Sequence, residues 1–179
     1  MKLVIKYGGT SISNAKDIQA VSKHVNELSK KHQIVLVCSA TSGTTDDLIE
    51  ISESIKKENK SKAEQLVSKI TNRHKQLAKQ TIKKSDVQKK LLIKLNEDFK
   101  ELLALIDGLV LLGEVTSRSM DYLISFGERL SIKLVAAAIN DLTKKSISLT
   151  GKEVGIVTDS NFGESKPLMD TTRLRVSKN

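Results

Sequence analysis

Residues 2–11, Lys-Leu-Val-Ile-Lys-Tyr-Gly-Gly-Thr-Ser, decide how the chain begins to fold. Residues 2–6 are apolar and β-branched in the middle, which predicts a short β-strand. Gly8 and Gly9 follow almost at once, and a helical pattern begins near Asn14. Glycines directly after a strand let backbone amides approach a ligand, because no Cβ stands in the way. The same pair could merely form a tight turn, and the residues alone leave both interpretations open.

A positive charge stands beside these glycines. Lys6 is the last residue of the predicted strand and can place its ammonium near the same point. The N-terminus of the following helix adds free N–H groups and the positive end of the helix dipole, which favour a phosphate. The stretch is not the phosphate loop G-x-x-x-x-G-K-[ST], because the lysine precedes the glycines.

A second strand ends in a second polar loop. Residues 34–38, Ile-Val-Leu-Val-Cys, form an uninterrupted apolar run, which predicts a parallel strand covered by helices on both faces. Residues 39–45 are small and rich in hydroxyls, and a helix opens after them. Ligands bind beyond the carboxyl ends of strands in open α/β sheets, so this loop and the glycine turn are expected to line one crevice. The hydroxyls could instead cap the following helix.

The order of elements in the first 55 residues predicts an α/β fold with an open, doubly wound parallel sheet. Residues 56–110 are expected to be helical, with a break at 83–86 and Ser85 or Asp86 as the N-cap of the second helix. An apolar seam for helix packing is predicted at Leu92, Leu95, Phe99, Leu102 and Ile106. The remaining expected elements are a helix over 117–142, interrupted near 125–128, and strands at 146–149 and 155–158.

Composition excludes several classes of protein. A length of 179 residues with 39% hydrophobic content suits one domain, or a large piece of one. The single cysteine, Cys38, excludes an internal disulfide and is expected to be a buried thiol. No apolar run approaches the roughly 18 residues of a membrane span, and the short N-terminal apolar stretch does not fit a secretory signal. We therefore expect a cytoplasmic protein without a membrane partner.

The net charge of +9 has a local origin. Fourteen basic and five acidic residues lie in residues 56–100, so this segment carries the whole excess. Phe99 is its only aromatic residue, and platforms on which bases could stack are therefore lacking. A solvated helical face is favoured over a nucleic-acid-binding module, which stays as an alternative. No pattern of His and Cys predicts a metal site formed by protein ligands.

Residues 125–131, Ser-Phe-Gly-Glu-Arg-Leu-Ser, place a glycine inside a helical pattern. A glycine there costs about 1 kcal/mol relative to alanine, so close packing or the display of a side chain to a cleft should compensate. Glu128 could meet a ligand amine, or it could be an exposed carboxylate paired with Arg129 or Lys133. Residues 155–163 end a predicted strand in a polar turn, which either contributes to a site or only builds the turn.

Taken in order, these motifs resemble the N-terminal part of aspartate kinases, which are amino-acid kinases. The family opens with K-[FY]-G-G-T-S, matched by residues 6–11, and continues with V-S-A-x-x-x-x-T-[ND], matched from Ser39 and Ala40 to Thr45 and Asp46 except that Cys38 replaces the valine. It then has S-F-G-E-R-L-S, matched at every position of residues 125–131. The resemblance implies an incomplete three-layer α/β/α sandwich with a mainly parallel sheet.

The resemblance also implies a reaction and roles for matching residues. Aspartate kinases transfer the γ-phosphoryl of ATP to the β-carboxylate of L-aspartate, giving 4-phospho-L-aspartate, with Mg²⁺ accompanying ATP. Lys6 would be catalytic, and ATP phosphates would lie near Lys6, Gly8, Gly9, Thr10, Ser11 and Ser39. Ser39, Thr45 and Glu128 would hold aspartate, with Glu128 on the substrate ammonium. No metal ligand is expected in this chain.

Part of the family pattern is not found in this sequence. A Gly-Arg-Gly-Gly-Ser-Asp segment, most of the nucleotide pocket and the regulatory domains do not occur in residues 1–179. The chain is therefore expected to be the amino-acid-binding lobe, inactive by itself, which associates with itself or with a complementary kinase half. A non-catalytic aspartate-binding or oligomerising relative, and a kinase with another acceptor, remain alternatives.

Overall fold

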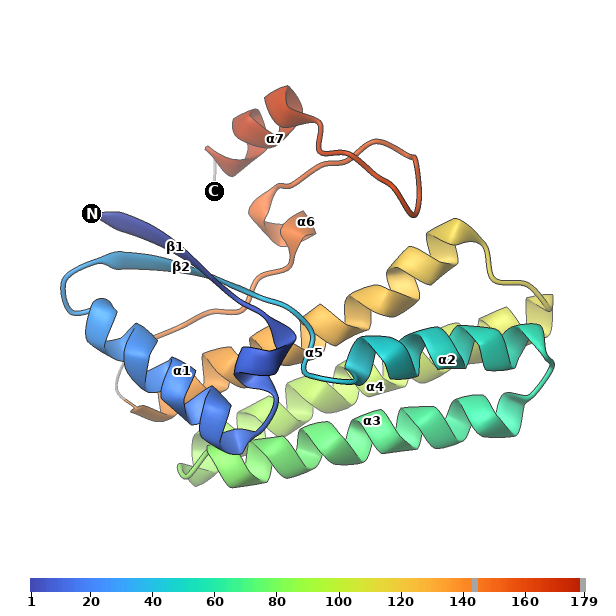
Figure 1. Ribbon diagram of the computed structural model, residues 1–179, viewed down its shortest axis with the longest axis horizontal. Coiled ribbons are helices and arrows are strands. Elements are labelled where there is room, and N and C mark those ends of the chain that lie inside the picture. Colours follow the sequence, from blue (N-terminus) through green and yellow to red (C-terminus); the bar gives the residue numbers. More distant parts are fainter. Residues whose placement is uncertain (143–144, 178–179) are drawn as a thin grey trace.

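The computed structural model describes residues 1–142 and 145–177 as a small parallel sheet on a group of long helices (Figure 1). Both strands predicted in the first 40 residues are present. The elements, in chain order, are β1 (Lys2–Tyr7), the 3-10 helix η1 (Gly9–Ile12), α1 (Ala15–Leu28), β2 (Gln33–Cys38), α2 (Thr44–Lys56), α3 (Lys60–Thr81), α4 (Ser85–Leu112), α5 (Ser117–Leu142), α6 (Gly151–Val154) and α7 (Met169–Val176).

The sheet pairs β1 with β2 in parallel, from Lys2 opposite Gln33 to Tyr7 opposite Cys38. Helix α1 joins the two strands, and the Asn14 side chain caps it by accepting a hydrogen bond from the Asp17 amide. The inner face of the sheet packs against the helices through partly or fully buried side chains, among them Ile34, Leu36 and Cys38. The βαβ start predicted from the sequence is therefore confirmed.

Helices α2 to α5 pack against one another and bury the main core. The predicted seam of α4 contributes to it, because Leu95, Phe99, Leu102 and Ile106 are buried and Leu92 is partly buried. Gly113 follows the last residue of α4 as its C-cap, and its φ of 71° is left-handed and suits glycine. Within the described residues, no helix is long and apolar enough to cross a membrane.

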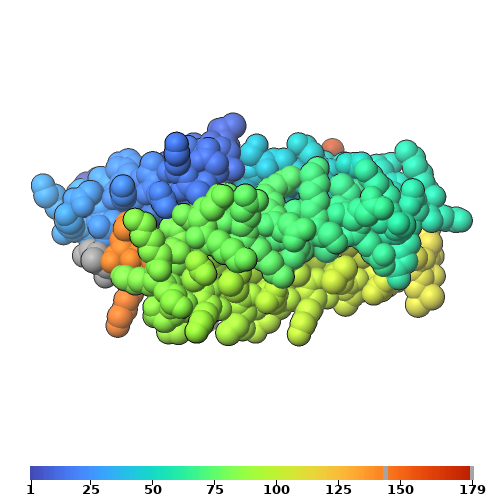
Figure 2. All heavy atoms as spheres, turned by 90° about the horizontal axis from the view of Figure 1, so that it is seen from below, coloured from blue at the N-terminus to red at the C-terminus, as the bar shows by residue number. Residues whose placement is uncertain are grey.

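The basic segment forms an outer face of the helical layer. Figure 2 shows α3 and α4, in green, covering most of the side viewed from below. Several lysines there are ion-paired with acids, for example Lys60 with Asp107 at 2.8 Å and Lys69 with Asp47 at 2.7 Å. These pairs support the interpretation of residues 56–100 as a solvated helical face.

The second face of the sheet is not covered as the sequence predicted. Val4 and Val35 are 74% and 56% exposed, and Val37 is exposed as well. Helices α6 and α7 lie on that side of the strands in Figure 1 without burying these valines. The prediction that 34–38 is a strand covered on both faces is therefore wrong for the described part of the chain, in which β2 pairs only with β1.

The two later strands were also predicted wrongly, because their main-chain groups bond elsewhere. Around 146–149, the Ser146 amide donates to the Asn140 side chain, whose amide in turn donates to the Ser146 carbonyl. Around 155–158, the Val157 amide donates to the Thr172 hydroxyl. Only an isolated antiparallel bridge joins Thr158 to Pro167 in the described residues.

Two details of the long helices also differ from the prediction. Helix α4 begins at Ser85, but neither Ser85 nor Asp86 is its N-cap; Lys84 takes that position. The amides of Lys83 and Lys84 donate instead to the carboxylate of Asp141 at the end of α5, at 3.1 and 2.7 Å. A tertiary contact thus replaces the local cap. Helix α5 runs without the interruption expected near 125–128.

Close packing compensates for the glycine inside α5. A Cβ built on Gly127 would lie 2.7 Å from the Ala40 Cβ and 3.6 Å from Leu48. The loop after β2 therefore rests directly on the backbone of α5. On the same loop side of the sheet, the Cys38 thiol is buried, as predicted, and burial raises its pKa to about 11.

Replacing this glycine should destabilise the protein although alanine is the better helix former. For Gly127→Ala we expect the free energy of unfolding to fall by about 1–3 kcal/mol, because the new methyl group collides with Ala40. Gly108→Ala in α4 is the matched control: nothing lies within 4 Å of its Cβ, so the same change should stabilise by up to about 1 kcal/mol. Urea denaturation of both variants measures this; stabilisation by Gly127→Ala would contradict the packing argument.

Candidate functional site

The loops that follow β1 and β2 touch each other at the carboxyl end of the sheet. The Ser39 amide donates to the Tyr7 carbonyl at 3.1 Å, which continues the ladder of the sheet. One residue further on, a Cβ on Gly9 would lie only 2.8 Å from the Ala40 carbonyl oxygen. Glycine at this position therefore permits the close approach of the two loops.

A pocket of about 410 Å³ opens between these loops and α5. It brings together five of the residues singled out from the sequence: Gly9, Thr10, Ser39, Thr45 and Glu128. The pocket is also lined by Ala40, Thr41, Ser42, Gly43 and Asp46, which complete the loop and the first turn of α2. Thr41, Ser42 and Gly43 were not among the predicted site residues, although they belong to the predicted loop.

Three other predicted residues do not line the pocket. Lys6 is exposed on the outer face of β1, opposite Val37 in the register. Gly8 precedes η1 with an extended backbone, and nothing lies within 4 Å of its Cβ position. Ser11 is exposed, and its amide donates to the Gly8 carbonyl at 3.0 Å. All three lie at the same end of the sheet as the pocket.

Glu128 is the acidic side chain that α5 contributes to the pocket. Its carboxylate accepts a hydrogen bond from the Ala40 amide at 3.2 Å. Among the described residues no cation forms an ion pair with it, since Arg129 and Lys133 bind carboxylates of α4. The structure therefore does not contain the alternative ion pair of Glu128 with Arg129 or Lys133.

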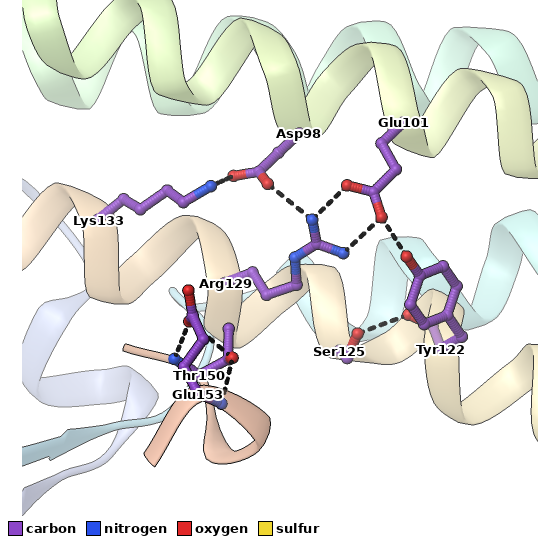
Figure 3. A network of polar contacts seen from close by, with 8 residues as sticks. All are labelled: Asp98, Glu101, Tyr122, Ser125, Arg129, Lys133, Thr150 and Glu153. Carbon is purple, nitrogen blue, oxygen red and sulfur yellow. Dashed lines mark hydrogen bonds and ion pairs between the residues drawn. The ribbon is translucent and has the colours of Figure 1, made fainter. Parts of the chain in front are cut away.

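A polar network fixes the opposite side of α5 (Figure 3). The Arg129 guanidinium lies between Asp98 and Glu101 of α4, with its Nη2 2.9 Å from Asp98 Oδ1. Lys133 binds the second oxygen of Asp98 at 2.5 Å, and the Tyr122 hydroxyl donates to Glu101. Because consecutive residues of a helix point in different directions, Arg129 anchors α5 to α4 while Glu128 lies in the pocket.

The electrostatics of this network favour its charged form. The Arg129 guanidinium lowers the pKa of Glu101 to about 2, and Glu101 in turn raises the pKa of Arg129. Asp98 is only 2% exposed and binds two cations. The ring of Phe126 lies 4.3 Å below the guanidinium carbon, which adds a cation–π contact. Glu101 and Arg129 are therefore both charged at neutral pH.

The last residue of the 125–131 motif also acts on the pocket. Ser131 is buried, and its hydroxyl donates to the Ser39 carbonyl at 2.7 Å. The motif thus supports the loop at two points, through Gly127 beneath Ala40 and through Ser131 beneath Ser39. The sequence did not reveal this role of Ser131, because a helical serine usually has only local partners.

The pocket has two carboxylates among its lining residues. Its carboxylates are those of Asp46 and Glu128, and the latter already accepts from the Ala40 amide. Within residues 1–142 and 145–177, no three His, Cys, Asp or Glu side chains gather as metal ligands would.

The sequence profile of the Amino acid kinase family matches residues 1–177. The chain belongs to the amino acid kinase family. Its match extends over every element described above, including the two loops and the motif in α5.

Among curated proteins the chain is similar to aspartokinases. It is 34% identical over 145 residues to the aspartokinase of Schizosaccharomyces pombe, covering 78% of this chain and 28% of that protein. It is 30% identical over 162 residues to the chloroplastic aspartokinase 1 of Arabidopsis thaliana, covering 89% of this chain and 27% of that protein. The chain therefore spans less than a third of the length of these relatives.

The fold is that of a solved aspartokinase. The crystal structure of Escherichia coli aspartokinase III in complex with aspartate and ADP superposes with a TM-score of 0.85 at 18% identity. The superposition covers 100% of this chain and 37% of the other. This confirms the predicted fold class, an incomplete α/β sandwich of the amino-acid kinase type with a small parallel sheet.

Removing the central carboxylate of the α4–α5 network should be costly. For Asp98→Ala we expect the free energy of unfolding to fall by about 3 kcal/mol, because Arg129 and Lys133 lose a buried anion. Asp107→Ala breaks an exposed pair with Lys60 and should cost less than about 1 kcal/mol. Chemical denaturation compares the two variants, and equal losses would show that burial of the network contributes nothing.

Proposed function

We propose that the pocket between the two loops binds L-aspartate, and that the chain is the amino-acid-binding lobe of an aspartate kinase. Such an enzyme transfers the γ-phosphoryl of ATP to the β-carboxylate of aspartate and forms 4-phospho-L-aspartate. The observation that carries the proposal is the Glu128 carboxylate, which lies in the pocket without an ion pair to a described residue. A carboxylate in that state suits the ammonium group of an amino acid.

The pocket supplies further groups that suit this substrate. Ser39 and Thr45 line it as well, and their hydroxyls and the amides of the loop can bond to the carboxylates of aspartate. The Ala40 amide already orients Glu128 before any ligand arrives. Preorganised partners of this kind hold a substrate at low entropic cost.

The ATP side of the proposal depends on the first loop. Phosphoryl transfer needs positioning and stabilisation of negative charge, which a lysine and backbone amides can provide. We assign Lys6 to the transferring phosphoryl and place the phosphates near Gly8, Gly9, Thr10, Ser11 and Ser39. Lys6 is exposed at the end of β1 beside the pocket, so its long side chain is free to turn toward a nucleotide.

The proposed reaction uses residues outside this chain. The family pattern places most of the nucleotide pocket in a later segment, and the chain spans 27–28% of the length of the two aspartokinases compared above. A complementary kinase half or a second copy of the chain would meet it, and the exposed valines of the sheet supply an apolar contact surface. Self-association and a cytoplasmic location both stay predictions.

One observation favours a second candidate function. Lys6 does not line the pocket that holds Glu128, as a catalytic lysine acting on bound aspartate would be expected to do. A relative that binds aspartate without transferring phosphate would need the pocket and not the lysine. Both candidate functions use Glu128 to bind aspartate, but only the kinase needs Lys6.

The role of Glu128 is testable by calorimetry with L-aspartate. Glu128→Gln keeps the shape of the side chain and removes its charge, so we expect the affinity to fall about tenfold or more. Glu27→Gln, on the exposed surface of α1, should leave the affinity unchanged. An unaltered affinity in Glu128→Gln would remove that residue from the site, and a wild-type chain without affinity for aspartate would contradict the proposal itself.

The two candidate functions are separated at Lys6. In a complex with the nucleotide-binding half, Lys6→Ala should lower turnover about a hundredfold or more, because charge on the transferring phosphoryl is no longer offset. Lys2→Ala, an exposed lysine on the same face of β1, should keep normal turnover. Turnover is measured with ATP and aspartate. Full turnover by the Lys6 variant would remove Lys6 from the reaction, whereas no turnover by the unaltered complex that still binds aspartate would favour the non-catalytic candidate.

A further inference from the structure

His74 lies in α3, within the basic segment to which no motif assigned a role. Its side chain is 0% exposed, although imidazole is polar and α3 is otherwise an amphipathic surface helix. The ring packs edge-on against Phe99 of α4 and reaches the loop after β2. Because buried polar groups are normally hydrogen-bonded, both ring nitrogens of His74 are expected to have partners.

The bonds of His74 have one consistent direction. Its Nδ1 lies 2.9 Å from the Ile70 carbonyl oxygen, which can only accept, so Nδ1 carries the proton. Burial lowers the pKa of His74 to about 4, so the ring is neutral near pH 7 and its Nε2 is an acceptor. The Thr41 hydroxyl, 3.2 Å away, must therefore donate to Nε2.

The same reasoning extends the relay to the start of α2. Since the Thr41 hydroxyl donates to His74, it accepts from the Thr44 hydroxyl at 2.8 Å. Thr44 in turn accepts from Arg73 Nη1 at 3.3 Å, and Arg73 also pairs with the buried Asp47 at 2.8 Å. Two neighbouring residues of α3 thus hold both ends of the turn, with every hydroxyl proton directed from Arg73 toward His74.

This relay fixes the part of the loop that joins two predicted aspartate contacts. Thr41 and Thr44 are buried, and both lie between Ser39 and Thr45 in the chain. The Thr44 amide closes the turn by donating to the Thr41 carbonyl at 3.0 Å, and Gly43 takes a φ of 74° there. The side-chain relay therefore supports the same turn that the backbone bond closes.

We propose that His74 is a positioning residue for the pocket, because its neutral ring accepts the last bond of the Arg73–Thr44–Thr41 relay and so fixes the loop at 39–45. The inference rests on the proposed function in taking this loop as an aspartate contact. His74 itself does not line the pocket and acts through Thr41.

Three variants of the 179-residue chain test the proposal. His74→Leu removes the acceptor, whereas His74→Gln can place an amide oxygen near the position of Nε2. Leu77→Ala is the matched control, since it damages the buried face of the same helix without touching the relay. Two quantities are measured: hydrogen exchange of the loop amides, above all that of Thr44, in the absence of ligand, and the affinity for L-aspartate.

In His74→Leu we expect exchange of the Thr44 amide to accelerate about tenfold and aspartate affinity to weaken about tenfold, because a buried hydroxyl has lost its acceptor. His74→Gln should restore both quantities to within about threefold, and Leu77→Ala should lower the melting temperature without accelerating loop exchange.

Unchanged exchange in His74→Leu, no rescue by glutamine, or an equal effect of Leu77→Ala on loop exchange would each overturn the proposal. Normal aspartate affinity in His74→Leu would overturn it too. If the wild-type chain binds no aspartate while the exchange pattern holds, the proposed function fails and the positioning of the loop stands.

Discussion

The pocket depends on three close contacts that Ala40 makes with two other segments, the first loop and α5. The carbonyl oxygen of Ala40 meets the backbone at Gly9, its methyl group meets the backbone at Gly127, and its amide donates to Glu128. Two of these contacts tolerate no side chain larger than hydrogen on the partner. One small residue after β2 therefore brings the first loop, the second loop and α5 together, and the distances among them follow from van der Waals contact.

Local patterns in the sequence were sufficient for the elements that carry their own signal. The strands predicted at 2–6 and 34–38 follow from short apolar runs rich in β-branched residues, and the buried stripe of α4 follows from helical spacing. The strand predicted at 146–149 is wrong for a physical reason. β-Propensity describes how a residue fits a sheet, and the described part of the chain offers 146–149 no partner strand. Likewise, the carboxylate of Asp141 in α5 accepts the hydrogen bond at the start of α4, where Ser85 or Asp86 was expected to be the N-cap.

The motif in α5 indicated the protein family but not the directions in which its side chains point. Neither its spacing nor its composition predicts that Arg129 points to α4 while Glu128 points to the loop. From the sequence alone, Arg129 and Glu128 could equally have formed an ion pair with each other. The direction is decided by carboxylates on another helix, Asp98 and Glu101. The partner of His74 was also unpredictable from the sequence. A lone histidine in a helical pattern does not indicate Thr41, because the two residues are 33 positions apart in the chain.

The bond between Ala40 and Glu128 closes a loop of 88 residues. Closing so long a loop costs entropy that is recovered only once the intervening helices have collapsed, and contacts of this kind slow folding. The hairpin formed by α3 and α4 lies inside that loop and consists of local contacts that can form early. Because Glu128 of α5 lines the pocket, the pocket cannot form during synthesis until α5 has left the ribosome.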